Sequence, residues 1–437
     1  MNKTGTAESG RDNRAIWSWA LFDFANSPFS ALVVTFIYAT YFTQAIAPNP
    51  ITGTELWSRG VAITAVVVAL LSPLLGTVAD RGGYRKRFLA IATVIAIAAT
   101  IALYPVLPGE VTKALTIFVI ANIAFEMGQV FYNAFLPDIA PEGRIGRVSG
   151  LGWGLGYVGG LIALTLALFA FIQPETPWFG FSKELGENIR ATNLLVALWL
   201  AVFCLPIFLF VHEDRSAVTR SGSILSASYK QLLHTFRDIR QYRQTVRFLV
   251  ARLLYNDGLV TVFAFGGIYA AGTFGFTTEK ILIFGIVLNI AAGAGAFLFG
   301  HFDDKMGGKR TIEVSLWGLS AATLLAILAH NEILFWIAGI TIGIFAGPNQ
   351  SASRSLLGRF VPPDKENEFF GFFAFSGKAT AFIGPLMLGL LTEWFDTQRA
   401  GITIVLVLFA AGLLTLRGLD EAEGMRQRDA APGPVAT

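Results

Sequence analysis

Charged residues are scarce in this sequence. Asp, Glu, Lys and Arg make up 14% of its 437 residues, whereas apolar types make up 54% and the mean hydropathy is +0.58. A soluble globular chain has about 25% charged residues, and one hydrophobic core stops growing at about 250–300 residues. So few charges cannot cover the surface of a soluble protein of this length. The composition excludes a soluble enzyme, a disordered chain and a fibrous protein, and it indicates a polytopic membrane protein.

Cysteine and histidine are scarcer still. The one cysteine, Cys204, lies in an apolar run, so no intrachain disulfide can form. The four histidines are scattered along the chain, which does not favour a metal site. The net charge of +3 is too small to indicate a nucleic-acid partner. We therefore expect no metal, no cofactor, no nucleic acid and no enzymatic activity.

Long apolar runs are abundant instead. A bilayer core of about 30 Å needs roughly 20 helical residues, and twelve runs of this kind occur. The first and tenth are the weakest, because Asp23 and Pro28 interrupt one, and Pro348 and Asn349 the other. The twelve predicted spans lie at approximately 16–46, 60–79, 88–107, 114–136, 150–172, 191–211, 248–273, 281–300, 312–330, 333–353, 369–391 and 400–416.

The loops between these runs differ in positive charge. With the N-terminus in the cytoplasm, 25 of the 33 Lys and Arg residues fall on the cytoplasmic side and six on the other. Such an excess marks cytoplasmic loops. Residues 1–14 are polar and no small-residue cleavage site follows the first run, so we predict no secretory signal peptide. The sequence predicts a multi-pass protein of the plasma or inner membrane with both termini cytoplasmic.

The longest polar stretch, 212–247, separates the sixth and seventh runs. It predicts a cytoplasmic linker with an amphipathic helix on the membrane surface, either a passive connection or a gate or partner site. The tail at 418–437 is polar and rich in Pro and Ala, which predicts disorder. The apolar positions of the predicted helix are Leu225, Tyr229, Leu232, Phe236 and Ile239.

An internal repeat relates the two halves of the chain. Because each half holds six spans, both insert the same way up, as parallel repeats. The sequence thus predicts an N-terminal tail at 1–14 and two six-helix halves at 15–211 and 248–417. The matching segments are Gly76–Lys86 with Gly300–Arg310, Pro141–Gly150 with Pro362–Gly371, and Ile37–Ala39 with Ile268–Ala270.

The first pair of matching segments carries a known motif. Gly-x-x-x-Asp-Arg/Lys-x-Gly-x-Arg/Lys-Arg/Lys begins at Gly76 and again at Gly300, and it resembles the signature of the major facilitator superfamily. Phe131–Gly160 and Ser353–Lys378 are similar to the branch of autophagy-related vacuolar amino-acid effluxers and their bacterial relatives. The resemblance covers about residues 14–416. It implies the major facilitator fold and a secondary transporter.

The resemblance also implies a conformational gate in the two signature loops. Asp80 would contact the start of the eleventh span near Phe369–Gly371, and Asp304 the start of the fifth near Ser149–Gly150. The alternative is a basic loop that only sets membrane topology. The candidate gate residues are Gly76, Asp80, Arg81, Gly83, Arg85, Gly300, Asp304, Lys305, Gly307 and Lys309.

Polar residues also lie inside the apolar spans, where a charge costs at least about 2.5–3.5 kcal/mol and usually faces a cavity or a partner. In the first and fourth spans they recur at helical spacing, which places them on one face. The resemblance implies that spans one, four, seven and ten line a central cavity. The candidate substrate or proton residues are Asp23, Asn26, Asn122, Glu126, Gln129, Asn133, Arg252, Asn256, Asp257, Asn349, Gln350 and Lys378.

Three acids against two bases in these spans leave one acid without a formal partner. An unpartnered carboxyl in a low-dielectric site tends to hold a proton. We favour Glu126, near the middle of the fourth span, as a proton site coupled to transport. Arg252 or Lys378 can bind a substrate carboxylate or pair with an acid. In the alternative interpretation, all these groups form static networks between spans.

The sequence as a whole predicts alternating access by a monomer embedded in the bilayer. No ATPase motif is present, so a proton or solute gradient would supply the energy. We expect a small polar solute as substrate, with amino acids suggested by the resemblance alone. The competing hypothesis is a receptor or scaffold that uses the same fold without transport.

Overall fold

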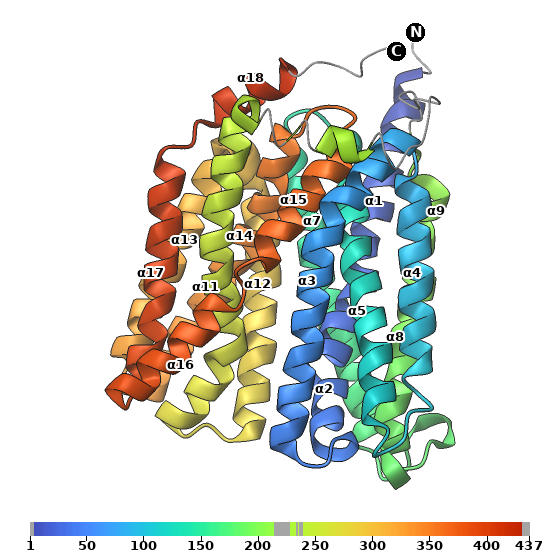
Figure 1. Ribbon diagram of the computed structural model, residues 1–437, viewed down its shortest axis with the longest axis vertical. Coiled ribbons are helices and arrows are strands. Elements are labelled where there is room, and N and C mark those ends of the chain that lie inside the picture. The colour runs from blue at the N-terminus through green and yellow to red at the C-terminus, as the bar shows by residue number, and fades with distance from the viewer. Residues whose placement is uncertain (1–3, 214–227, 233–234, 236–238, 431–437) are drawn as a thin grey trace. The chain divides into compact units, whose positions relative to one another are not determined.

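The computed structural model describes residues 4–213, 228–232, 235 and 239–430, and these ranges contain helices and no strand (Figure 1). Eleven described segments are long and apolar enough to cross a membrane. One predicted span, 88–107, is absent from these eleven. Its helix α4 (Arg85–Ala102) is 18 residues long and begins with three basic residues, Arg85–Arg87, which shortens its apolar part. The predicted all-helical membrane fold is confirmed, with a helix count of approximately twelve.

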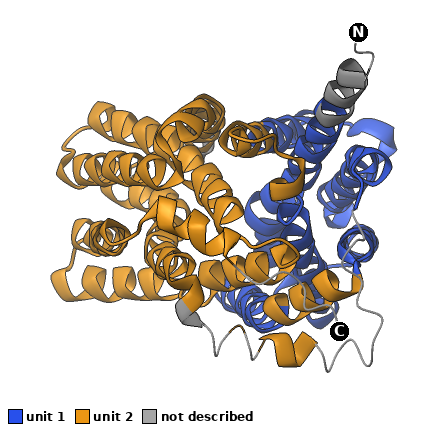
Figure 2. Cartoon of the chain, turned by 90° about the horizontal axis from the view of Figure 1, so that it is seen from above, with its two compact units in different colours: residues 1–71, 83–135, 155–216 blue, residues 72–82, 136–154, 217–437 orange. Residues whose placement is uncertain are grey.

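The chain divides into two compact units (Figure 2). Unit 1 contains residues 1–71, 83–135 and 155–216, and unit 2 contains residues 72–82, 136–154 and 217–437. These boundaries differ from the predicted halves, because 72–82 and 136–154 group with the C-terminal half. Segment 72–82 contains most of the repeated motif that begins at Gly76, and segment 136–154 contains the repeat Pro141–Gly150. The contacts of these motifs are described below.

Unit 1 begins with a span that changes its helical register at a proline. The α-helical part, α1 (Thr4–Pro28), continues as a π-helix, η1 (Phe29–Phe36). Proline has no N–H to donate and clashes with the preceding turn, so the regular hydrogen-bond pattern changes at Pro28. The remaining helices are α2 (Tyr38–Tyr41), η2 (Phe42–Ile46), α3 (Pro50–Gly82), α4, α5 (Val111–Asn133), α7 (Ile145–Leu166), η3 (Ala167–Ile172), η4 (Trp178–Gly180), η5 (Glu184–Gly186), α8 (Glu187–Phe203) and α9 (Leu205–Phe210).

Closely packed helices make up unit 2. Small residues bring α12 (Thr278–Met306) and α14 (Glu332–Phe360) close together: a Cβ added at Gly347 would lie 2.0 Å from the carbonyl oxygen of Ala292. Such close backbone approach is typical of membrane helix packing. Besides the ends of α3 and α7, the unit contains α6 (Leu136–Ile139), η6 (Ile239–Tyr242), α11 (Arg243–Phe274), α12 (Thr278–Met306), α13 (Gly308–Leu328), α14 (Glu332–Phe360), α15 (Glu366–Lys378), α16 (Ile383–Phe395), α17 (Gln398–Arg417) and α18 (Glu421–Asp429).

The predicted eleventh span is two helices and not one. Helix α15 ends at Lys378, and α16 begins at Ile383 (Figure 1). Pro385 lies in the first turn of α16, where a missing N–H is tolerated. A continuous helix would lose a hydrogen bond at this position, which favours the break. Proline alone does not cause it, because Pro73 and Pro348 lie inside the continuous helices α3 and α14.

The expectation of a disordered tail over 418–437 is wrong for its first part, which forms α18. Asp420 accepts a hydrogen bond from the Glu423 backbone N–H and so caps the helix. Acidic residues in the first turn and basic residues in the last suit the helix dipole. Arg426 donates to Glu423 at 2.8 Å, and this contact lowers the pKa of the Glu423 carboxyl. Capping depends on single residues at the helix ends, so the overall composition of the tail did not predict this helix.

Most of the predicted amphipathic helix lies outside the described residues, Leu225 and Phe236 included. Residues 228–232 are helical, and Ile239 begins the 3₁₀ turn η6. Within the described part Ser228 is buried, whereas Tyr229 is exposed. The predicted apolar face therefore stays a prediction.

Candidate functional site

Asp80, in the first signature loop, accepts hydrogen bonds at the start of α15. Its Oδ1 accepts from the backbone N–H of Asn367 (3.0 Å), and its Oδ2 from that of Glu368 (2.8 Å). The Asn367 side-chain amide donates to Oδ1 as well, at 2.6 Å. The first N–H groups of a helix lack partners within the helix and carry partial positive charge. A carboxylate at this position is therefore stabilising, and it sits slightly before the stretch expected from the resemblance.

Asp304, in the second signature loop, makes the corresponding contact with α7. Its Oδ1 accepts from the Gly146 backbone N–H at 2.7 Å. Its Oδ2 accepts from the backbone N–H of Arg147 at 3.3 Å and from the Arg147 Nε at 2.8 Å. Each of the two repeated aspartates thus caps the start of a helix from the other half of the sequence.

A buried arginine and a second aspartate reinforce the contact around α7. Arg354 donates to the Ser149 hydroxyl (3.0 Å) and to the Ser149 carbonyl oxygen (2.7 Å). Asp303 accepts from the Arg359 Nη1 at 2.8 Å. Sequence reasoning did not select these residues as a site, although Arg354 is a charge within an apolar run.

A third carboxylate caps the helix that follows the second signature loop. Glu421, in α18, accepts from the backbone N–H groups of Gly308 and Lys309, at 3.0 Å each. In unit 1 the Lys86 backbone N–H donates to Glu213 at 3.3 Å. The repeat therefore extends to the segments that follow the sixth and twelfth spans, which the sequence comparison missed.

The other candidate gate residues shape the turns or lie around them. Gly83 and Gly307 have φ values of +60° and +87°, which favour glycine. Arg81 donates to Gln231, and Lys309 Nζ donates to the Leu419 carbonyl at 2.8 Å.

The remaining candidate gate residues differ in burial. Arg85 is buried, with its guanidinium 5.0 Å from the Phe135 ring centroid. Lys305 is exposed, and a Cβ added at Gly300 would lie 2.9 Å from the Gly146 carbonyl oxygen.

Gly76 lets α3 approach the start of α15. A Cβ added at Gly76 would lie 2.2 Å from the Asn367 carbonyl oxygen, a backbone atom that cannot rotate away. We expect Gly76→Ala to destabilise this contact by about 1–3 kcal/mol and to lower the Tm in detergent. Gly389→Ala is the control, because nothing lies within 4 Å of its added Cβ. An equal Tm for the two variants would contradict the packing argument.

The polar residues of the first span lie in α1. Asp23 and Asn26 are buried, at 8% and 6% exposure. Ser27 donates to the Asp23 carbonyl at 2.8 Å. The side-chain nitrogen of Asn26 has no hydrogen-bond partner within the described residues, so its donor is available to a ligand.

The polar residues of the fourth span lie along the one continuous helix α5, so their spacing places them on one face. They are Asn122, Glu126, Gln129 and Asn133. Helix α1 and its continuation η1 pack against α5 through two stacked aromatic pairs, Trp19–Tyr132 and Phe29–Phe125, both with 4.7 Å between ring centroids. The polar residues of α1 and those of α5, which we call the two polar stripes, therefore lie on neighbouring helices of unit 1.

Unit 2 brings together most of its candidate residues. Gln350 on α14 donates to Asn256 on α11 at 3.3 Å, and Asn256 donates to the Gly377 carbonyl at the end of α15 (3.1 Å). Arg252, four residues before Asn256, donates to the Phe373 carbonyl at 2.7 Å. Lys378 is the last residue of α15. Three helices thus meet through amide and guanidinium groups.

Asn349 points elsewhere. It donates to the Ser315 hydroxyl of α13 at 3.0 Å and is fully buried. Its role in the described structure is to join α13 and α14, so it is not part of the network around Asn256. No group of three or more His, Cys, Asp and Glu side chains in the described ranges is arranged to hold a metal ion.

Solved structures with the same arrangement of helices are known. XylE, a proton:xylose symporter of the major facilitator superfamily, matches with a TM-score of 0.75 and 14% identity over 97% of this chain and 99% of XylE. FucP, in the outward conformation, matches with a TM-score of 0.74 and 15% identity, over 94% of this chain and 98% of FucP. This chain therefore has the same fold as these two proteins.

Sequence relatives place the chain within that superfamily. An uncharacterized MFS-type transporter of Bacillus subtilis, YxiO, is 29% identical, over 92% of this chain and 94% of its own length. Autophagy-related protein 22 of Yarrowia lipolytica is 22% identical over 71% of this chain and 56% of its own length. The sequence model of the family described as vacuole effluxer Atg22 like matches residues 11–429. The chain belongs to this family, and it is an integral membrane transporter rather than an enzyme.

Proposed function

We propose that the protein moves a small polar solute, with amino acids as the substrate class, by proton-coupled alternating access. The observation that carries this proposal is the burial of ionisable side chains inside membrane-spanning helices. Asp23, Arg252 and Asp257 are 8%, 7% and 2% exposed. Such groups are costly in a bilayer and are usually retained for a pathway.

The polar stripes of α1 and α5 in unit 1, and the network around Asn256 in unit 2, are two candidate substrate-binding groups, each within its own unit. Arg252 and Asn26 offer donors suited to a carboxylate. The description of the family as vacuole effluxers supports the export of a solute, and amino acids as its class rest on the sequence resemblance alone. The description of XylE as a proton symporter supports proton coupling, with Glu126 as the acid favoured by the sequence.

The signature loops are the candidate gate of this transporter. Asp80 and Asp304 would close the cytoplasmic side when they cap α15 and α7, and would release those helices when it opens. The excess of Lys and Arg in the loops supports a cytoplasmic location for this side and for both termini, in the plasma or inner membrane. We propose a monomer as the working unit.

A binding screen followed by flux tests the proposal. The purified protein is heated with members of an amino-acid panel, and a ligand should raise the Tm because it binds the folded state alone. The stabilising solute is then followed into proteoliposomes. Stabilisation without any flux would favour the receptor or scaffold hypothesis over transport.

A further inference from the structure

The break in span eleven is held by two charged side chains of α11. Arg252 Nη1 donates to the Phe373 carbonyl (2.7 Å) and to the Ser376 hydroxyl (2.9 Å) in the last turns of α15. Asp257 Oδ2 accepts from the Gly384 N–H at 3.0 Å, in the first turn of α16. A positive group thus faces a helix C-terminus and a negative group a helix N-terminus, as the helix dipoles favour.

Two glycines allow these side chains to approach the break. A Cβ added at Gly377 would lie 2.8 Å from Arg252 Nη1. At Gly384 it would lie 2.1 Å from Thr261 Oγ1 and 3.1 Å from Asp257 Oδ1. Any larger side chain at Gly384 would push the N-terminus of α16 away from its carboxylate cap.

One oxygen of this cap lacks a partner. Asp257 is 2% exposed, and its Oδ1 makes no hydrogen bond within the described residues. A buried carboxylate with an unpaired oxygen is costly unless it gains a cation or a proton. Asp257 therefore combines a helix cap with a buried acceptor that points to a small cationic ligand.

No basic side chain in the described part of the chain forms an ion pair with Asp257. Arg252 is directed at α15, and Arg354 at Ser149. On α17, Leu408 and Phe409 face the neighbouring Gly258. The other basic residues of the helices packed against α11 are Lys280, Lys305, Arg359, Lys378, Arg399, Arg417, Arg426 and Arg428. The acids with described side chains on those helices are Asp303, Asp304, Glu332, Glu366, Glu368, Glu393, Glu421, Glu423 and Asp429.

Helix α16 packs against α17, where a Cβ added at Gly401 would lie 2.1 Å from Thr392 Oγ1, but it has few other anchors. Gly384 and Leu388 are the buried residues of its 13, and large side chains such as Trp394 are exposed. The charged cap supplies about 0.3–1 kcal/mol, and up to about 2 kcal/mol in a buried geometry. A change in the charge of Asp257 would therefore change how firmly α16 is held.

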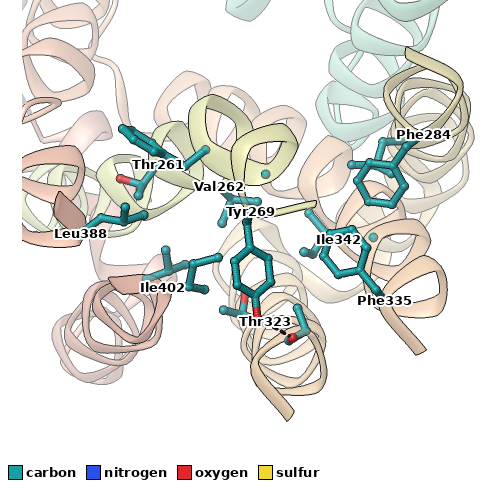
Figure 3. Close-up of a pocket in the computed structure, with 15 residues that line it drawn as sticks. Thr261, Val262, Tyr269, Phe284, Thr323, Phe335, Ile342, Leu388 and Ile402 are labelled. Carbon is teal, nitrogen blue, oxygen red and sulfur yellow. Dashed lines mark hydrogen bonds between the residues drawn. The ribbon is translucent and has the colours of Figure 1, made fainter. Parts of the chain in front are cut away.

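An apolar cavity of about 40 Å³ lies beside this cap. Figure 3 shows Thr261 and Leu388 at one side of it and Phe284 and Phe335 at the other. Thr261 donates to the Asp257 carbonyl at 2.7 Å, so the cap and the cavity share a wall. The cavity leaves one side of α16, at Leu388, incompletely packed, so the helix has room for a small shift when the cap weakens.

We propose that Asp257 is a proton-binding site whose protonation loosens α16 from α11 and lets it shift toward the cavity. This inference rests on the proposed transport function, and it adds to Glu126 a second acid, one that couples a proton to a moving helix. The carboxylate form caps Gly384, and the neutral carboxylic acid is the weaker acceptor. The proton adds to Oδ1, the oxygen without a partner.

A distance measurement at two pH values tests the proposal. With Cys204 replaced by Ser, spin labels are placed at Trp394 and Ile333, which are 71% and 72% exposed. In lipid nanodiscs the label distances should shift to shorter values at acid pH. Asp257→Asn should remove the shift, and Asp257→Glu, which keeps a titratable carboxyl, should keep it. Glu393→Gln is the matched control on α16 and should respond like wild type.

The outcomes separate this inference from the transport proposal. A pH-dependent shift that persists in Asp257→Asn, or its absence in wild type, would overturn the proton site. If Asp257→Asn does not fold, the Glu variant must shift at a different midpoint pH, and an unchanged midpoint would overturn the proposal as well. A wild-type shift without flux of any solute would reject transport and leave the proton site standing. Flux with an undiminished pH dependence in Asp257→Asn would reject the proton site and leave the transport proposal standing.

Discussion

Amide hydrogen exchange at the starts of α15 and α7 is expected to become roughly 10- to 100-fold faster when Asp80 and Asp304 are replaced by Asn. Hydrogen bonds to a charged group contribute about 1.5–3 kcal/mol, and each 1.4 kcal/mol is about a tenfold change in an equilibrium. Asp80→Asn should act on 366–371 and Asp304→Asn on 145–150, since these segments hold the donating amides.

The two single variants serve as controls for each other, because each should spare the other's segment. Glu142→Gln is a matched control in the exposed loop before α7. Exchange measured by mass spectrometry in nanodiscs gives the opening equilibrium directly. Unchanged exchange in both aspartate variants would show that the carboxylates do not hold the gate shut.

Glu126→Gln is expected to abolish the response of transport to a pH gradient. One pH unit stores about 1.4 kcal/mol per proton, which supports about tenfold accumulation of a solute. The variant keeps the size and polarity of the side chain in α5 but cannot exchange a proton. Accumulation in proteoliposomes should fall from about tenfold to no accumulation, with exchange of solute between the two sides retained.

The control for this variant lies at the start of the same helix. Glu110 is hydrogen-bonded by the Leu107 N–H and by Lys113, and these contacts lower the pKa of its carboxyl. The Glu110 carboxyl stays ionised over the pH range of the transport assay. Glu110→Gln should therefore leave the response of accumulation to the pH gradient intact. Full gradient dependence in Glu126→Gln would reject the proton role of Glu126.

The repeated motifs were the most informative part of the sequence. Their spacing, with the family resemblance, placed Asp80 and Asp304 against helix starts in the other half, and the structure has both carboxylates at such starts. The contact with α15 begins at Asn367 and not at Phe369. Helix boundaries depend on local capping, which a pattern of apolar residues leaves uncertain by a few residues.

Other features depend on contacts between distant residues and were not predictable. The break in span eleven combines a local signal, Pro385, with Arg252 and Asp257, which lie more than 120 residues away in the sequence. Glu421 caps α13 from a segment that composition alone marked as disordered. Hydropathy identifies which residues are in a membrane but not which side chain reaches which helix end.

The arrangement of the polar residues inside the spans was also predictable only in part. The spacing of Asn122 and Glu126 correctly implied one helix face, because α5 is continuous. Asn349 and Gln350 are adjacent in sequence, yet one binds Ser315 of α13 and the other Asn256 of α11. Adjacent residues on a helix point about 100° apart, so membership of a site follows from the neighbouring helices.

Solute uptake into proteoliposomes that contain the wild-type protein, with and without an inward pH gradient, is the decisive test of proton-coupled transport. We expect saturable uptake of the stabilising solute, faster with the gradient and slowed when the buried residues Asp23, Arg252 and Asp257 are neutralised. Uptake no faster than in empty liposomes, from protein that is folded and binds the solute, would contradict this expectation.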